Sequence, residues 1–320
     1  MRFALMTEPQ QGLSYDEILA LARAAEDAGL ETFFRSDHYT SFPGEAGLPT
    51  TDAWATLAGL ARDTTRIGLG TLVSPVTFRI PGPFAKMVAT VDEMSGGRIE
   101  LGMGAGWNDE EHAELGIPFP PLGERYDMLE EAVAIVHGLW TEPDGWGLEG
   151  KHWRVAGSRF HAKPARNGRR HPPIILGGDG GPRLARLAAR YADEFNLSSA
   201  TPQKAREAFG RMRDTCVAID RDPGSLRLSA MTGVLLADSP GELRDRIREQ
   251  LAFTGAGDDA EAWLADRRDR WILGTLDEAS SRVQALADAG AERIMLQDFL
   301  PRDVAMVGLM GHLAAAMAGG

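Results

Sequence analysis

The chain of 320 residues is 43% apolar and 25% charged, and it carries a formal net charge of -12. This composition is typical of a globular protein with a large core, and the acidic excess argues against a general binder of nucleic acid or anionic membranes. No apolar run approaches the roughly 18 residues that a membrane span needs, and the N-terminus shows no signal-peptide pattern. The single Cys216 excludes a disulfide framework. We therefore expect a cytoplasmic protein with neither a membrane nor a nucleic-acid partner.

Strand and helix patterns alternate along the chain. A first strand is predicted over residues 2–7, and a second begins at residue 32 and stops at Asp37 and His38. Apolar runs predict six further strands, over residues 66–73, 98–103, 174–176, 194–197, 226–236 and 293–296. Helical spacing fills the intervals between strands, except that residues 141–173 are interpreted as an insertion with one hairpin.

Several helices carry start and stop signals in the sequence. Capping boxes are predicted at residues 14–17, 239–242 and 275–278, where Ser or Thr is followed three residues later by Glu. Gly29 and Gly290 each end a helix just before a strand, within two similar segments of sequence. The similarity of these two segments indicates that one structural unit is repeated.

Eight strands that alternate with helices, without a linker between domains, predict a single (β/α)8 barrel of the TIM type over residues 1–320. The barrel is expected to carry insertions after its fourth and seventh strands. The alternative is a doubly wound open sheet, which would be expected to carry a glycine-rich dinucleotide turn after the first strand. Residues 7–12 do not form such a turn.

Asp37 and His38 end the second strand and therefore lie at the face of a barrel where ligands bind. An Asp can hold a polar ring edge, and a His can act as an acid or base near neutral pH. The alternative is a capping Asp beside a loop His with no chemical role. Position alone leaves both interpretations open.

Two glycine-rich loops follow predicted strands. Residues 102–106 allow a flat ligand to approach the backbone, although a tight turn explains them equally well. Residues 177–183 contain four glycines before a Pro that begins a helix, and the exposed N–H groups and helix dipole suit a phosphate. We favour a phosphate site there over a plain turn, and Arg183 would supplement it.

The acidic segment 109–114 contains His112 and raises the question of a metal site. Its residues lack the spacing of zinc ligands. We therefore interpret it as a solvated acidic turn and predict no metal.

Six segments together carry a resemblance to a known family: Ser36-Asp37-His38 and residues 69–79, 91–98, 101–107, 116–125 and 189–196. The chain resembles the luciferase-like superfamily of flavin- and deazaflavin-dependent oxidoreductases. Within it, the chain is most similar to the branch of coenzyme F420-dependent oxidoreductases. The matching segments span nearly the whole chain in register with the predicted barrel.

The resemblance implies roles for particular residues. His38 would be the catalytic proton donor or acceptor, and Asp37 would lie at the isoalloxazine-type ring. Thr71, Leu72 and Val73 would form a bulge behind the ring, with a cis peptide bond at Leu72–Val73. The other cofactor residues are Ala105, Gly106, Gly177, Gly178 and Gly181 at the phosphate arm, and Asn196 and Ser198 lining the site.

The sequence departs from the sugar-phosphate dehydrogenases of this group at two positions. Trp107 stands where those enzymes have a Glu, and Phe42 stands where they have a Trp. This predicts a more apolar substrate pocket, lined by Phe42 and Trp107 with Trp146 or Trp153. The cofactor implied is F420, with FMN as the alternative, and Arg79 and Arg183 are expected to meet its anionic tail.

The expected activity is hydride transfer between reduced F420 and a small organic substrate such as an imine, a ketone or an activated alkene. An FMN-dependent monooxygenase that uses reduced flavin and oxygen is the alternative enzyme. A non-catalytic flavin-binding protein is the alternative from another class. We also expect a homodimer.

Overall fold

Buried, largely apolar runs form eight parallel strands that close into a barrel in the computed structural model, which describes residues 1–161, 163–164, 168–199 and 201–318. Each strand pairs in parallel with the next, and the last pairs with the first. The predicted barrel is therefore confirmed. Its strands are β1 (Arg2–Thr7), β2 (Thr32–Arg35), β3 (Gly68–Pro75), β4 (Ile99–Gly104), β7 (Ile174–Gly178), β8 (Glu194–Ser198), β9 (Arg227–Leu236) and β11 (Arg293–Gln297).

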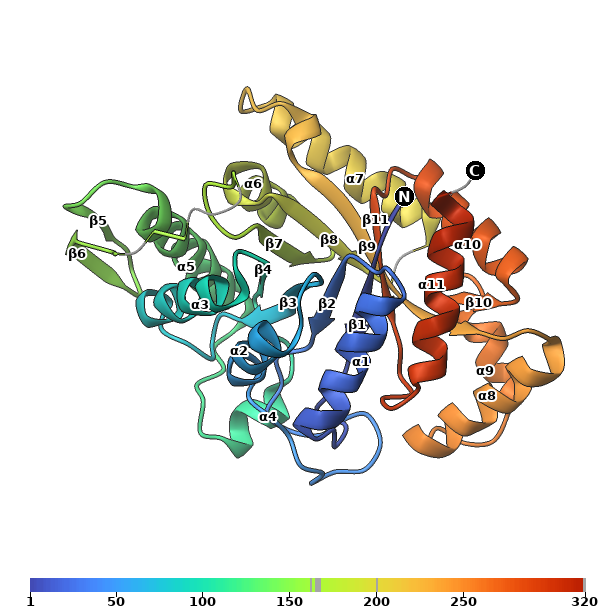
Figure 1. Ribbon diagram of the computed structural model, residues 1–320. Helices are drawn as coiled ribbons and strands as arrows, with labels where there is room; N and C mark the ends of the chain where they lie inside the picture. Colours follow the sequence, from blue (N-terminus) through green and yellow to red (C-terminus); the bar gives the residue numbers. More distant parts are fainter. Residues whose placement is uncertain (162, 165–167, 200, 319–320) are drawn as a thin grey trace.

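The helices lie outside the strands (Figure 1). Most of them pack an apolar face inward, as α1 does with Ile18, Leu21, Ala22 and Ala25 at helical spacing. The helices are α1 (Tyr15–Asp27), α2 (Ala53–Asp63), α3 (Pro81–Ser95), α4 (Asp109–Glu114), α5 (Leu122–Thr141), α6 (Pro182–Tyr191), α7 (Pro202–Val217), α8 (Pro240–Thr254), α9 (Ala260–Arg267), α10 (Leu276–Asp288) and α11 (Val304–Ala318). In the described part of the chain, no helix combines the length and apolar character that crossing a membrane requires.

The predicted capping boxes are formed at two of the three sites. At α1, Ser14 and Glu17 cap one another reciprocally, and the box of Thr275 and Glu278 begins α10. At α8 the prediction was half right. The Ser239 side chain accepts from the Glu242 N–H, but the Glu242 carboxylate accepts from the N–H of Asp238, not from that of Ser239.

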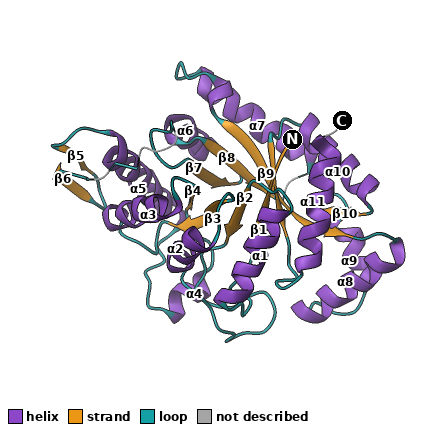
Figure 2. Ribbon diagram, in the orientation of Figure 1, coloured by secondary structure: helices purple, strands orange, loops and turns teal. Residues whose placement is uncertain are grey.

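Two insertions interrupt the regular alternation, as expected (Figure 2). After β4 and α5, strands β5 (Trp146–Glu149) and β6 (Arg154–Ser158) form an antiparallel hairpin at one end of the molecule. After β9, the chain forms α8, α9 and the short strand β10 (Ile272–Gly274), which pairs with the end of β9.

The hairpin corrects one expectation about the substrate pocket. The Trp146 ring lies so close to Gly138 of α5 that a Cβ at this glycine would come within 2.2 Å of it. Trp153 is likewise partly buried against the main core. Both rings therefore serve the packing of the hairpin, and the expectation that either lines a pocket with Phe42 and Trp107 is not supported.

The N-terminal end of the barrel is closed by a buried ion cluster. Arg293 is fully buried, and its guanidinium lies 2.7 Å from a carboxylate oxygen of Glu100 and 3.2 Å from one of Glu194. An apolar layer that includes Met6, Phe34 and Leu72 fills the barrel interior above it. A ligand of the barrel therefore has access only from the carboxyl ends of the strands.

Candidate active site

The carboxyl ends of β2, β3 and β4 bring three polar segments together at the mouth of the barrel. Parallel neighbours end at the same edge, so residues that are far apart in sequence become adjacent. The segments are Ser36–Tyr39 after β2, Ser74–Arg79 at the end of β3 and Ala105–His112 after β4. The first contains the predicted Asp37 and His38.

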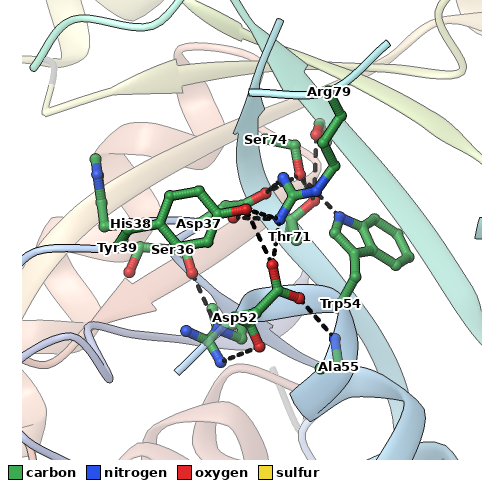
Figure 3. A network of polar contacts seen from close by, with 12 residues as sticks. Ser36, Asp37, His38, Tyr39, Asp52, Trp54, Ala55, Thr71, Ser74 and Arg79 are labelled. Carbon is green, nitrogen blue, oxygen red and sulfur yellow. Dashed lines mark hydrogen bonds and ion pairs between the residues drawn. The ribbon is translucent and has the colours of Figure 1, made fainter. Parts of the chain in front are cut away.

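Arg79 is the centre of a polar network at this mouth (Figure 3). Its guanidinium contacts both carboxylate oxygens of Asp37, and its Nη2 lies 2.8 Å from the Tyr39 hydroxyl and 2.8 Å from Asp52 Oδ2. Asp52 also caps α2 by accepting from the Ala55 N–H at 2.8 Å. The network thus fastens the loop after β2 to the loop after β3.

The network corrects the role expected for Asp37. Its side chain is fully buried, with one oxygen accepting a 2.6 Å bond from Ser74 and both oxygens facing Arg79. A carboxylate enclosed in this way is not available to hold a cofactor ring. We infer that Asp37 fixes the loops instead.

Both arginines that were expected to meet an anionic tail are paired with carboxylates of the protein. Burial opposes the charge on Arg79, but the adjacent carboxylates raise its pKa. Arg183, in the first turn of α6, bonds to Glu130 at 2.6 Å and Asp127 at 2.5 Å on α5, which raises its pKa as well. Each guanidinium is therefore committed to carboxylates of the protein itself.

The end of β3 has the irregular geometry that the resemblance implied. The register with β4 shifts between Thr71 and Ser74, and the Leu72–Val73 peptide bond is cis. Thr71 is fully buried and donates its hydroxyl to the Gly102 carbonyl at 3.2 Å. The bulge turns Leu72 and Val73 into the barrel interior, where they join its apolar layer.

Glycines on the neighbouring strands accommodate the bulge. A Cβ at Gly104 would lie 2.6 Å from Val73 Cγ2, and a Cβ at Gly177 would lie 2.9 Å from Val73 Cγ1. Backbone can approach Val73 this closely only where no side chain intervenes. Gly177 thus has a packing role that the sequence did not indicate.

His38 is held by a residue that the sequence analysis missed. Its Nδ1 lies 2.9 Å from Glu111 Oε2, and the other oxygen of Glu111 accepts from the backbone N–H groups of Tyr39 and Thr40, at 3.1 Å for Thr40. Glu111 is fully buried, although it belongs to the segment interpreted as a solvated turn. That interpretation was wrong, because α4 presents one side to the protein and only the other to solvent.

His112 anchors α4 to the loop after β3. Its Nε2 lies 2.6 Å from the Thr77 hydroxyl, and its Nδ1 lies 2.5 Å from the Asn108 carbonyl. The ring also contacts Phe78 and Phe119 at centroid distances of 5.0 and 4.5 Å. Among the residues that the structure describes, no group of three or more His, Cys, Asp or Glu side chains is placed to hold a metal.

The rings of His38, Phe42 and Trp107 lie together at the mouth of the barrel. The His38 ring lies edge-on to Phe42 at 4.5 Å and to Trp107 at 5.7 Å, and the two aromatic rings are 5.3 Å apart. Trp107 remains 67% exposed, although it is a large apolar side chain. The predicted pocket residues Phe42 and Trp107 are therefore brought together with His38, with apolar surface left to solvent at the mouth.

The two glycine-rich loops follow neighbouring strands, since β4 pairs with β7. Ala105 and Gly106 follow β4, Gly177 and Gly178 end β7, and Gly181 precedes the first residue of α6 without a side-chain cap. A Cβ at Gly181 would meet no atom within 4 Å. Open space beside a helix N-terminus fits a phosphate group.

Asn196 and Ser198 lie on β8, on the far side of β7 from β4. Asn196 is buried, and its amide contacts the Ser229 hydroxyl at 3.0 Å and the Met295 sulfur at 3.3 Å. Ser198 is half-buried at the end of the strand. Asn196 thus contributes to the barrel interior, while Ser198 is at the rim.

Comparison with known proteins agrees with this geometry. A family model described as luciferase-like monooxygenase matches residues 1–319. An F420-dependent glucose-6-phosphate dehydrogenase from Intrasporangium calvum is 31% identical over 301 residues, covering 85% of this chain and 85% of that protein. The family match confirms the resemblance that the sequence motifs carry.

Solved structures share the fold at lower identity. An F420-dependent secondary alcohol dehydrogenase in complex with an F420-acetone adduct has a TM-score of 0.81 at 19% identity, over 99% of this chain and 98% of that one. A monooxygenase from Streptomyces bottropensis has a TM-score of 0.82 at 22% identity, again over 99% and 98% of the two chains. With its sequence matched from residue 1 to residue 319 and its barrel shared, the chain belongs to the luciferase-like monooxygenase family.

Proposed function

We propose that this protein is an F420-dependent oxidoreductase that transfers a hydride between the deazaflavin and a small organic substrate at the barrel mouth. The observation that carries the proposal is the placement of His38. Its ring is held by buried Glu111 and lies beside two aromatic rings, at the rim where β2 ends. Relatives named as F420-dependent dehydrogenases support the choice of cofactor.

The described residues fit such a cofactor at two places. The bulge of Leu72 and Val73 offers an apolar surface for one face of a flat ring. Gly181, in the loop after β7, leaves room for a phosphate at the N-terminus of α6. When bound, the deazaflavin supplies the hydride chemistry, and the protein supplies orientation and proton delivery.

His38 is the residue that we propose moves the proton. Reduction of a ketone or an imine requires a proton at the oxygen or nitrogen as the hydride reaches carbon. His is the side chain whose ordinary pKa lies closest to neutral pH, so it suits both donation and acceptance. With Nδ1 engaged by Glu111, Nε2 is the nitrogen that remains for the substrate.

The aromatic rings beside His38 favour an apolar substrate over a sugar phosphate. Phe42 and Trp107 present hydrocarbon surface beside His38. Arg79, the cation of the mouth network, is enclosed by Asp37 and Asp52. A small ketone, imine or activated alkene suits this surface better than an anion does.

A second candidate is an FMN-dependent monooxygenase. It is favoured by the description of the family and by the fold shared with the Streptomyces bottropensis monooxygenase. The two candidates differ in cofactor and in the use of oxygen.

Titration of the purified protein with F420 and with FMN separates the two candidates. We expect fluorescence quenching to give a lower Kd for F420 than for FMN, and anaerobic turnover of a panel of ketones, imines and activated alkenes with reduced F420. Micromolar FMN affinity without detectable F420 binding would overturn the proposal. Light scattering of the same sample tests the expected homodimer.

A further inference from the structure

Glu111 joins the loop after β2 to the short helix α4, and the proposed function uses it only as the residue that holds the His38 ring. We propose that Glu111 is a positioning residue that fixes the tautomer of His38, so that Nδ1 carries the hydrogen and Nε2 presents its lone pair to the substrate. This inference rests on the proposed function, in which His38 handles the proton. It adds the residue that determines which nitrogen does so.

The contacts of Glu111 make its carboxylate an acceptor on both oxygens. Oε2 faces His38 Nδ1 at 2.9 Å, and Oε1 accepts from the N–H groups of Tyr39 and Thr40. Burial opposes ionisation, but the bond to His38 and the two backbone N–H groups together lower the pKa of Glu111 below its usual range. The group opposite Nδ1 is therefore a carboxylate, which has no hydrogen to donate.

A neutral imidazole has one N–H and one lone pair. Because the carboxylate can only accept, the hydrogen resides on Nδ1 and the lone pair on Nε2. In the oxidative direction, Nε2 would accept the hydroxyl proton of an alcohol, and the bound deazaflavin would supply the acceptor for the hydride that the carbinol carbon loses as the C–O bond becomes a carbonyl. In the reductive direction, Nε2–H would return the proton. In both directions, Nδ1 keeps its hydrogen and donates it to the Glu111 carboxylate.

The position of Glu111 does not depend on its bond to His38. The Asn108 side chain accepts from the Glu111 N–H at 3.3 Å, and His112 bonds to Thr77 on the other side. The helix is thus held at its start and along its buried side. A change confined to the Glu111 carboxylate should leave α4 in place.

Glu111→Gln is the sharpest variant because it nearly preserves shape. The amide oxygen can still accept from the N–H groups of Tyr39 and Thr40, as Oε1 does now. The amide nitrogen then faces His38 as a donor, so Nδ1 must accept and the hydrogen moves to Nε2. Glu110→Gln is the matched control, since Glu110 is exposed on the same helix.

Nitrogen-15 NMR of the histidine side chains tests the tautomer in the cofactor-free protein. The chain has seven histidines, so the His38 signals are assigned by their loss in His38→Asn. We expect protonated Nδ1 in the wild type and in Glu110→Gln, and protonated Nε2 in Glu111→Gln. A wild-type His38 with its hydrogen on Nε2 would overturn the proposal without any variant, and so would an unchanged tautomer in a folded Glu111→Gln protein.

Kinetics provides the second readout. Loss of a correctly poised general base or acid typically lowers the rate about 10²–10⁴-fold, so we expect kcat of Glu111→Gln to fall by about 10²-fold or more. KM and the Kd of F420 should change little, because the carboxylate is fully buried and both its oxygens are engaged by the loop after β2. Equal kcat in the two proteins would contradict the role of Glu111, whereas absence of wild-type turnover with F420 would refute the proposed function and leave the NMR result standing.

Discussion

The two ends of the barrel each contain an arginine between carboxylates, fully buried at one end and partly buried at the other, yet the two clusters have different roles. At the closed end, Arg293 is fully buried and pairs with Glu100 and Glu194, side chains of the strands themselves. At the mouth, Arg79 pairs with Asp37 and Asp52, which belong to the loop region after β2. The first cluster closes one end of the barrel, and the second orders the loops to which we assign the chemistry.

The comparison teaches that a buried ion pair alone does not mark a functional residue. Both arginines have their pKa raised by adjacent carboxylates against the effect of burial. The mouth differs from the closed end because the rings of His38 and Trp107 lie there in contact, and Trp107 is exposed to solvent. Changes at the mouth should therefore affect turnover, and changes at the closed end should affect stability.

The largest effect is expected at His38. General acid–base catalysis is typically worth about 10²–10⁴-fold, so His38→Ala should lower kcat by about that factor while the Kd of F420 and the free energy of unfolding change little. Steady-state kinetics and fluorescence titration measure these quantities. His161→Ala is the control, because this side chain is 70% exposed and lies outside the mouth. Near-full turnover in His38→Ala would mean that the ring is only structural.

Arg293→Met should have its effect on stability. It removes the guanidinium, so that Glu100 loses its ion-pair partner in the buried cluster and Glu194 keeps only Arg227, a loss that typically costs about 3–5 kcal/mol. Urea denaturation gives the free energy of unfolding. Arg248→Met breaks an exposed pair with Asp245, which should cost less than about 1 kcal/mol. Similar losses in both variants would contradict the role assigned to the closed end.

Gly181→Val tests the phosphate site without disturbing the fold. A side chain there meets no atom within 4 Å, and the residue has a φ of -63°, which any residue can adopt. If a phosphate occupies this space, the lost contacts, worth about 1–3 kcal/mol, weaken F420 binding roughly 10- to 100-fold. Gly210→Val serves as the control, because Gly210 on α7 also has open space beside it and lies outside the two loops. An unchanged Kd would place the phosphate elsewhere.

The smallest effect concerns pH. The pKa of Glu111 is lower in the folded protein than the value of about 4.3 for an unperturbed Glu. The stability that its ionised form contributes is therefore present above about pH 4.3 and is lost as the pH falls towards the folded value. Glu111→Gln should show a shallower loss of unfolding free energy than the wild type as the pH falls from about 5 to about 3. Parallel curves would mean that the carboxylate is not stabilised in the folded state.

The sequence predicted the barrel because most strands are short runs rich in apolar residues and several helices carry caps that can be recognised locally. The bulge and cis bond at Leu72–Val73 were expected only through family resemblance, since no local pattern indicates them. The pairing of Asp37 with Arg79 was missed because the two residues are 42 positions apart and meet only when β2 lies beside β3.

Glu111 was missed for a different reason. In sequence it stands among Asp109, Glu110 and Glu114, and such a run usually faces solvent. Helical geometry separates these residues, so that Glu111 and His112 turn inward while the others turn outward. The useful signal was Asn108, a residue suited to cap a helix, because a helix in this segment has a buried face.

The central claim is direct hydride transfer between F420 and the substrate, and an isotope experiment tests it most directly. F420 reduced with deuterium at its hydride position is mixed anaerobically with the wild-type protein and a small ketone that it turns over, and the product is examined by mass spectrometry. The account predicts an alcohol with one deuterium on the former carbonyl carbon, and no carbon-bound deuterium when the label is supplied only as heavy water. An alcohol without carbon-bound deuterium, or turnover that requires oxygen and places an oxygen atom in the product, would contradict it.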